Sequence, residues 1–471
     1  MNPWPYVRHR PPIIQREFRG ENRLDPLSIS PEYATETRNF TSADYPALTV
    51  RPGYSVIGEI TGSKVLGMGV WKDKELHAVF ADGTWRRWTG SGWSSPLATG
   101  LDTAAMWSFT NVKANLSDIN LVGTNGKNGV RAYNGSTVSS IGNPVEGLDF
   151  IEQYYDRLWA AVKNTMHATA GSSADKWQTF NGDDEDSYFK ELDTPDGETI
   201  TAVKAGIGHV TIFKQTSMHE LFGAMVSTFR FQPVTFDIGA LNNRSVITIN
   251  GIMYILDRNG IYEYMGGAVP SKKFSTPVQW YVDNLNPAAR DTCSLGTDGK
   301  KLYVSLPVGN STLPNTILEY DPSKNTWYTW KDIQPTCFAS MAGILYIGDH
   351  SGRVLKLEGT ADGTAPVTSV WISKAFTAQS MSQTVRWLRA WITAKIPAGS
   401  TMNVYISKQV TGDDDWALIQ NIPATGWISS KPIYIKSSVA VNARYIRLKI
   451  ECTGPVTIHE IAREEDYLPL R

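Results

Sequence analysis

The sequence predicts an all-β protein: a β-propeller of six or seven blades, with an extended N-terminal arm and a C-terminal antiparallel β-sandwich. The chain has 471 residues, more than one ordinary domain holds. It contains 39 Gly, 25 Pro and 16 Trp, a mixture of turn residues and large apolar side chains typical of short strands joined by tight turns. A strand–turn–strand pattern also recurs roughly every 40–50 residues, which is the spacing of four-stranded propeller blades.

Residues 1–50 are predicted to form the arm. They contain seven prolines and show neither helical nor strand periodicity over any length. Arginine and aromatic side chains are common anchors of protein interfaces, so we expect the arm to latch onto a neighbouring subunit; a flexible tail is the alternative. The expected latch residues are Trp4, Tyr6, Arg8, Arg10, Arg16, Phe18, Arg19 and Arg23.

Residues 51–363 are predicted to form the propeller. Short apolar runs alternate with turns such as ADG and RNG, in which Asp, Asn or Gly accepts a positive φ. The recurring Trp, Tyr and Phe are expected to pack as wedges between neighbouring blades. Seven such segments begin near Val65, Ile119, Tyr155, Ile200, Ser245, Lys300 and Thr336.

Residues 364–471 are predicted to form the sandwich. Six segments, from VTSVWISKAF to PVTIHEIARE, alternate apolar and polar residues with a period of two. Six strands over this length suit a small antiparallel sandwich. Carbohydrate-binding modules share this pattern, so glycan binding stays open, although no ligand motif is present.

Composition excludes several classes of protein. A net charge of −1 argues against a protein that wraps nucleic acid in a basic surface. Three cysteines form no disulfide framework, and we expect buried thiols. No signal peptide or membrane-spanning stretch is evident, so no membrane insertion is expected. P-loop, GxGxxG, HExxH and GxSxG motifs are absent, so we expect no enzyme activity, no catalytic residue, no metal site and no cofactor.

The densest acidic run in the chain comprises Asp183, Asp184, Glu185 and Asp186. Four carboxylates in a row suggest metal binding or acid–base chemistry. Like charges this close repel one another and prefer solvent, however, so an exposed loop is the preferred interpretation. His209 and His219 flank a strand, but Glu220 is expected on the face opposite His219, and no ligand cluster is predicted.

One stretch resembles a known family. An acidic segment containing Trp177 is followed by the turn Pro195-Asp196-Gly197 and by an apolar strand. The next strand reads Phe-x-x-x-Ser-x-x-Glu-x-Phe at Phe213, Ser217, Glu220 and Phe222. In these motifs, and in the plan of arm, propeller and sandwich, the chain resembles the tail-nozzle or packaged-DNA stabilisation proteins of short-tailed bacteriophages.

The resemblance implies a virion protein without catalysis, assembled in the host cytoplasm. Copies, six in the familiar case, would form a ring below the portal or adaptor protein and contact other tail proteins. DNA would be a weakly held passenger, retained and later ejected, and the acidic loop would face the lumen of the ring. The arm is richer in arginine and aromatic residues than the family requires, so another kind of phage neck or tail stays open. A glycan-binding module of a phage fibre or another host-recognition protein is the alternative.

Overall fold

The computed structural model describes residues 11–194, 197–378, 380, 382–412, 415–423, 431–435 and 442–469. Almost all regular structure in this part of the chain is β-strand. The chain divides into two compact units. Unit 1 contains Met1–Tyr54, Glu319–Lys331 and Glu358–Arg471, and unit 2 contains Ser55–Leu318 and Asp332–Leu357.

Small antiparallel sheets make up the propeller, and we number them as blades along the chain. Blade 1 contains β6 (Val65–Trp71), β7 (Glu75–Phe80) and β8 (Thr84–Arg87). Blade 2 contains β9 (Ser108–Val112), β10 (Asn120–Thr124), β11 (Arg131–Tyr133) and β12 (Val138–Ser140). Blade 3 contains β13 (Asp149–Tyr154), β14 (Arg157–Val162), β15 (Thr165–Ala168) and β16 (Tyr188–Glu191).

Blades 4–7 continue in the same order. Blade 4 contains β17 (Ala202–Ala205), β18 (Val210–Phe213), β19 (Met218–Phe222) and β20 (Arg230–Thr235), and blade 5 contains β21 (Val246–Ile249), β22 (Ile252–Asp257) and β23 (Gly260–Tyr264). Blade 6 contains β24 (Ser294–Thr297), β25 (Leu302–Leu306), β26 (Thr316–Asp321) and β27 (Thr326–Trp330). Blade 7 contains β28 (Pro335–Met341), β29 (Ile344–Asp349), β30 (Val354–Leu357) and β5 (Tyr54–Ile57). The helices are short: η1 (Val226–Thr228), η2 (Asn243–Ser245), η3 (Lys273–Val278), α1 (Gln279–Asp283) and η4 (Pro287–Thr292).

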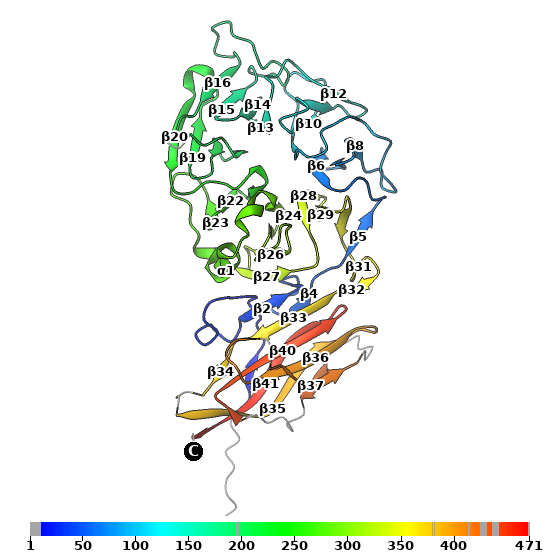
Figure 1. The fold of residues 1–471 in the computed structure, drawn as a ribbon, viewed down its shortest axis with the longest axis vertical. Coiled ribbons are helices and arrows are strands. Elements are labelled where there is room, and N and C mark those ends of the chain that lie inside the picture. The colour runs from blue at the N-terminus through cyan, green and yellow to red at the C-terminus, as the bar shows by residue number, and fades with distance from the viewer. Residues whose placement is uncertain are drawn as a thin grey trace, which may run out of the picture. The chain divides into compact units, whose positions relative to one another are not determined.

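The first strands of the blades close into a ring. Strands β6, β9, β13, β17, β21, β24 and β28 each contact the next, and β28 contacts β6. Figure 1 shows the blades arranged around a common centre. The predicted propeller is therefore confirmed, with seven blades in the described part of the chain. The last blade is closed by β5, a strand from the N-terminal side of the propeller that sequence periodicity did not reveal.

Aromatic side chains pack between blades, as the sequence predicts. Trp85 of blade 1 is fully buried and meets Trp107, which precedes blade 2, edge to face with ring centroids 5.6 Å apart. Tyr133 of blade 2 belongs to the same buried cluster. Such rings bury large apolar areas and prefer this edge-to-face geometry, so they stabilise the junction between blades.

The sandwich lies in unit 1 and consists of two sheets. One sheet contains β1 (Ile13–Gln15), β3 (Phe40–Thr41), β4 (Leu48–Val50), β35 (Gln383–Lys395), β38 (Lys431–Ile435), β39 (Asn442–Ala443) and β41 (Thr457–Pro469). The other contains β2 (Ala34–Arg38), β33 (Thr368–Ser373), β34 (Phe376–Thr377), β36 (Thr401–Ser407), β37 (Ala417–Ile422) and β40 (Tyr445–Thr453). All six predicted segments are strands. The short strands β31 (Ala361–Asp362) and β32 (Ala365–Pro366) precede them.

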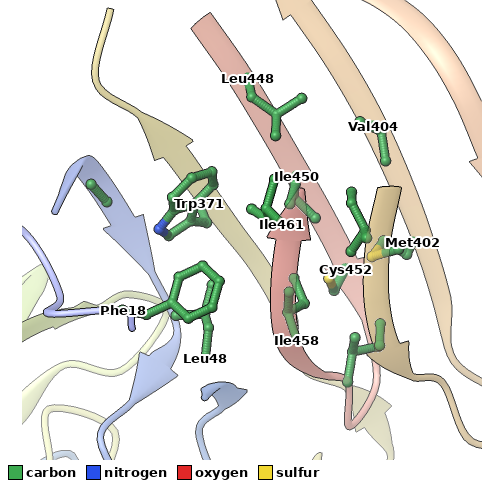
Figure 2. Packing of buried hydrophobic residues seen from close by; sticks show 14 of the residues in the cluster. Phe18, Leu48, Trp371, Met402, Val404, Leu448, Ile450, Cys452, Ile458 and Ile461 are labelled. Atoms are coloured by element: carbon green, nitrogen blue, oxygen red, sulfur yellow. The ribbon is translucent and has the colours of Figure 1, made fainter. Parts of the chain in front are cut away.

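The N-terminal segment belongs to the sandwich, which corrects the expected boundary at residue 50. β1 and β4 pair with β41, and β2 pairs with β33. Phe18 is completely buried and packs edge-on against Trp371, with ring centroids 6.0 Å apart (Figure 2). From residue 13 onward the segment thus supplies strands and core side chains rather than a separate arm.

Buried polar contacts also hold unit 1 together. The carboxylate of Glu21 is fully buried and accepts hydrogen bonds from the Thr37 amide, the Thr37 hydroxyl and the Thr329 hydroxyl, each at 2.8 Å. The guanidinium of Arg51 binds Asp362 through two nitrogens at 2.9 and 2.8 Å. The Glu21–Thr329 contact spans 308 residues of sequence and the Arg51–Asp362 contact spans 311, so these two contacts join the three parts of unit 1.

Candidate functional site

Large apolar side chains are exposed in three neighbouring blades of unit 2. Ile207 is 72% exposed, Met265 68% and Val269 66%. We define the apolar face as these three residues together with Tyr155, Phe180 and Met225, which are also exposed. Tyr155 and Ile207 lie in loops that join the first and second strands of blades 3 and 4, and Phe180 and Met225 lie in loops that join the third and fourth strands of the same blades. Met265 and Val269 follow the third strand of blade 5. Loops at these positions emerge at the same end of the blades. Exposed apolar patches of this kind mark interaction sites.

The acidic loop adjoins the apolar face. The Asp184 carbonyl accepts a hydrogen bond from the Val226 amide at 3.1 Å, and its carboxylate accepts one from the Ser227 amide at 3.1 Å. The loop of blade 3 is thereby joined to the loop of blade 4 that carries Met225. Acidic and apolar side chains consequently share one surface.

A buried arginine organises the acidic loop. The Arg157 side chain is 1% exposed and donates to the carbonyl oxygens of Thr169, Asp186 and Asp184 at 2.7, 2.6 and 3.1 Å. Its guanidinium also lies 3.7 Å from the Glu185 carboxylate. The loop is therefore folded around a cation of its own chain.

The expectation of four exposed carboxylates is confirmed for Asp183, Asp184 and Glu185 but is wrong for Asp186. Asp186 is buried, and its carboxylate accepts hydrogen bonds from the amides of Asn181, Gly182 and Asp183 at 2.5, 2.7 and 3.1 Å. A carboxylate that accepts three backbone amides stabilises a turn, and this contribution outweighs its preference for solvent. That the loop faces a ring lumen stays a prediction.

A buried His–Glu–Tyr cluster supports the loop of Ile207. Nε2 of His209 lies 3.2 Å from Oε1 of Glu220, and the Tyr264 hydroxyl donates to the same carboxylate. Nδ1 of His209 lies 3.1 Å from the Ile207 carbonyl oxygen. Burial, followed by the nearby Glu220, raises the pKa of Tyr264, so its hydroxyl stays a donor at neutral pH. The cluster positions the loop that exposes Ile207.

This cluster is not among the predicted sites, although the hairpin contains a signal for it. Thr211 of β18 pairs with Glu220 of β19. His209 precedes Thr211 by two residues and hence lies on the same side of the strand as Glu220. Glu220 therefore meets His209, which directly precedes the paired strand, whereas His219, the neighbour of Glu220 in sequence, lies on the opposite face.

The other residues of the family-like motif are structural where the structure describes them. Trp177 and Phe213 are buried in hydrophobic clusters, and the buried Ser217 hydroxyl contacts His219 at 3.2 Å. Phe222 contacts the His209 ring, with centroids 5.7 Å apart. Gly197 is exposed and has a φ of +66°, whereas Pro195 and Asp196 lie outside the described residues.

The expected latch residues separate into three groups. Trp4, Tyr6, Arg8 and Arg10 lie outside the described residues. Phe18 is a core residue of unit 1, which corrects its assignment to a latch. The remaining three form ion pairs within unit 1, namely Arg16–Glu460 at 2.5 Å, Arg19–Glu17 at 2.8 Å and Arg23–Glu21 at 2.7 Å. Arg16 and Arg19 keep exposed side chains, at 71% and 48%.

Across the described ranges, no group of three or more His, Cys, Asp or Glu side chains is arranged to hold a metal ion. None of the helices in those ranges is long and apolar enough to span a membrane. Cys293, Cys337 and Cys452 are free and buried, as expected.

No protein-family model and no curated protein sequence matches the chain. Solved structures similar to it include the extracellular domain of a proposed hybrid two component system from B. thetaiotaomicron, with a TM-score of 0.46, 11% identity, and coverage of 87% of this chain and 62% of that one. The chain thus spans less than two thirds of that structure. The Pan2 WD40 domain of Neurospora crassa has a TM-score of 0.41 and 9% identity, covering 62% of this chain and 88% of that one. These similarities support no functional argument.

Proposed function

We propose that this chain is a non-enzymatic structural protein of a bacteriophage tail or neck. Copies form a nozzle-like ring below the portal or adaptor protein, and the ring retains packaged DNA and lets it pass during ejection. The observation that carries this proposal is the apolar face of blades 3–5. Single exposed apolar residues are ordinary, whereas a set gathered at one end of three adjacent blades is typical of a surface that another protein covers.

A ring needs two different surfaces on each subunit, because its side-to-side contacts are heterologous. Unit 1 offers a second set of exposed apolar side chains in its N-terminal segment. Ile13 and Ile14 are 41% and 45% exposed, and Leu24 and Leu27 are also exposed. The chain thus has one candidate surface on each unit, which supports a head-to-tail contact between copies.

Charge is consistent with DNA as a passing molecule. The net charge is −1, and of the three exposed acids of the acidic loop only Glu185 has its carboxylate near Arg157, at 3.7 Å. A wall without a basic excess holds phosphates weakly, because DNA affinity comes mainly from displaced counterions at Lys and Arg.

Two aromatic rings among the described residues of the sandwich count against the alternative of a glycan-binding module. Glycan-binding sandwiches commonly offer open aromatic rings to sugars. Here Arg447 and Lys449 lie over the Trp416 ring at 4.8 and 5.1 Å from its centroid, and Lys449 lies 4.4 Å from that of Tyr405. Cations cover at least one side of both rings, so they are poor sugar platforms.

The test is assembly of the full chain, alone and with the portal or adaptor protein encoded beside its gene, followed by native mass spectrometry and negative-stain microscopy. We expect rings for the wild type and loss of rings for the double variant Ile207→Glu, Met265→Glu. Ile60→Glu is the matched control, because Ile60 is 64% exposed but lies outside the apolar face. Rings that persist in the double variant, or a monomer that instead binds a glycan array, would contradict the proposal.

A further inference from the structure

A cavity of about 180 Å³ lies on the axis of the propeller, within unit 2. Six of the seven inner strands each contribute at least one residue to its wall. The wall residues are Met68, Phe109, Lys204, Val246, Leu295 and Phe338. Five of these side chains are apolar, so the cavity is suited to the apolar body of a small molecule.

Two of the residues that line this cavity each carry a buried hydrogen-bond donor without a partner among the described residues. Trp107 is 4% exposed and lines the cavity, yet its indole Nε1 donates to no acceptor. Arg244 also lines the cavity, and its Nε is buried without a partner, although its Nη2 donates to the Asp291 carbonyl at 2.5 Å. An unpaired buried donor destabilises the protein, so a ligand that brings an acceptor gains from both donors.

The charged groups around the cavity favour an anion. Arg244 and Lys204 line it, and Lys64 lies close enough for its charge and that of Arg244 to repel each other. The facing acids are Glu152, whose carboxylate is 3.9 Å from the Lys204 amine, and Asp149 and Asp291, which interact with Arg244. Burial raises the pKa of Asp149 to about 7 and also raises that of Glu152, so these two acids neutralise the cations incompletely. The same burial lowers the pKa of Arg244 and of Lys64.

Two further titratable groups near the cations of the cavity, a thiol and an imidazole, are uncharged. Burial raises the pKa of the Cys337 thiol to about 11 and lowers that of His350 to about 4. Both groups are therefore neutral at pH 7. Neither adds a charge that would compete with Arg244 and Lys204 for the ligand.

We propose that the axial cavity binds a small organic anion, a carboxylate on a compact apolar body. The carboxylate oxygens accept hydrogen bonds from Arg244 Nε and Trp107 Nε1, which are the two donors left unpaired. The apolar body packs against Met68, Phe109 and Phe338. A cavity of roughly 150 Å³ holds a benzene ring, so a body of that size is the expected fit.

Benzoate is the probe for this proposal, with binding to the full chain measured by calorimetry and by the shift in melting temperature. Benzyl alcohol has a similar shape without the charge, and inorganic phosphate is an anion without an apolar body. We expect benzoate to bind and to raise the melting temperature, and both other probes to bind at least roughly tenfold more weakly.

Trp107→Phe removes the indole donor and keeps an aromatic ring, so it should weaken benzoate binding roughly tenfold. Trp93→Phe is the matched control, because Trp93 of unit 2 also has a buried indole nitrogen without a partner in the described residues but does not line the cavity. Arg244→Gln should weaken binding further, with circular dichroism confirming that the variant folds.

Several outcomes would overturn the proposal. They are no benzoate binding, equal binding of benzyl alcohol, equal binding of phosphate, or the same loss in Trp93→Phe as in Trp107→Phe. Equal binding of the alcohol would indicate an apolar cavity without anion selectivity. Equal binding of phosphate would indicate a bare anion site without a role for the apolar walls.

Discussion

The two units of the molecule are built from the chain in different ways. Unit 2 uses nearly consecutive segments, and six of the seven blades are local sheets whose strands follow one another, whereas the last is closed by the distant strand β5. Of blade 6, β27 and the end of β26 are grouped with unit 1. Unit 1 combines three segments, and its sheets pair strands such as β1 and β41 that lie about as far apart in sequence as the chain allows. The propeller therefore depends on many local contacts, whereas the sandwich depends on a few distant ones.

The two units also use buried polar groups differently. In unit 1 the carboxylates of Glu21 and Glu319 connect separate segments, and Glu319 accepts a hydrogen bond from the Thr41 hydroxyl at 2.8 Å. In unit 2, His77 and Asp82 act within a blade or a single turn, and the buried Glu220 reaches only to Tyr264 of the neighbouring blade. We infer that losing one polar group damages unit 1 more than unit 2, and four predictions test this difference.

The largest expected effect is that of deleting residues 1–30. The deletion removes β1, the core residue Phe18 and the buried Glu21. Loss of a buried Phe side chain alone costs about 3–5 kcal/mol, a large share of the roughly 5–15 kcal/mol that stabilises a typical domain. We expect proteolysis with mass spectrometry to show rapid cleavage within residues 358–471 and a resistant unit 2.

Deletion of residues 1–10 is the matched control for that experiment. It removes Trp4, Tyr6, Arg8 and Arg10 but keeps every described strand. We expect unit 1 to stay resistant, so that any loss of ring assembly reports on the latch alone. Equal resistance of the 1–30 deletion would contradict the structural role of the N-terminal segment.

The next effect is that of Glu21→Ala. The change leaves the buried amide and hydroxyl of Thr37 and the hydroxyl of Thr329 without their common acceptor. Removing one partner of a buried charged network costs about 3–5 kcal/mol. Glu36→Ala is the control, because the Glu36 side chain is 40% exposed and its ion pair with Arg23 at 3.2 Å should contribute at most about 1 kcal/mol. Similar losses in the two variants, measured by urea unfolding, would refute the argument.

His77 of unit 2 should make stability depend on pH. It is completely buried, accepts a hydrogen bond from Trp85 Nε1 at 3.0 Å, and burial lowers its pKa from 6.5 to about 4. The unfolded chain therefore binds a proton on His77 more tightly than the folded chain does. The contribution of neutral His77 to the free energy of unfolding is fully present above pH 6.5 and is lost as the pH falls to 4. The loss amounts to about 3 kcal/mol.

The comparison of wild type with His77→Gln isolates this contribution. The difference in their unfolding free energies should be smaller at pH 4 than at pH 6.5. The exposed His459 provides the control, and His459→Gln should leave the acid-side loss unchanged. A difference that is independent of pH would show that His77 does not supply it.

The smallest expected effect is that of Asp82→Ala in the turn of blade 1. Oδ1 of Asp82 accepts hydrogen bonds from the amide and the hydroxyl of Thr84 at 3.0 and 2.7 Å. The turn is local and partly exposed, so the loss should be about 1 kcal/mol. Asp237→Ala, at an exposed position, should change stability by less than about 0.5 kcal/mol. Thermal unfolding of both variants measures the difference, and a loss above that of Glu21→Ala would reverse the comparison of the units.

Local pattern predicted much of the fold. Each of the seven segments from Val65 to Thr336 contributes strands to a different blade, and each of the six segments after residue 363 is a strand of the sandwich. Turn residues and period-two alternation act over a few residues, so they are readable without tertiary contacts. The exposure of Asp183, Asp184 and Glu185 was predictable for the same reason, since adjacent like charges repel one another wherever they lie.

Other features depended on contacts between distant residues. The burial of Phe18 and Glu21, the closing strand β5 and the burial of Asp186 all need partners that local sequence does not indicate. The apolar face and the axial cavity likewise form only when loops and inner strands of several blades come together. By itself the sequence determined which segments become strands, because strand formation follows from nearby side chains. The tertiary structure decided which strands pair and which side chains meet, because those choices depend on packing between segments far apart in the chain.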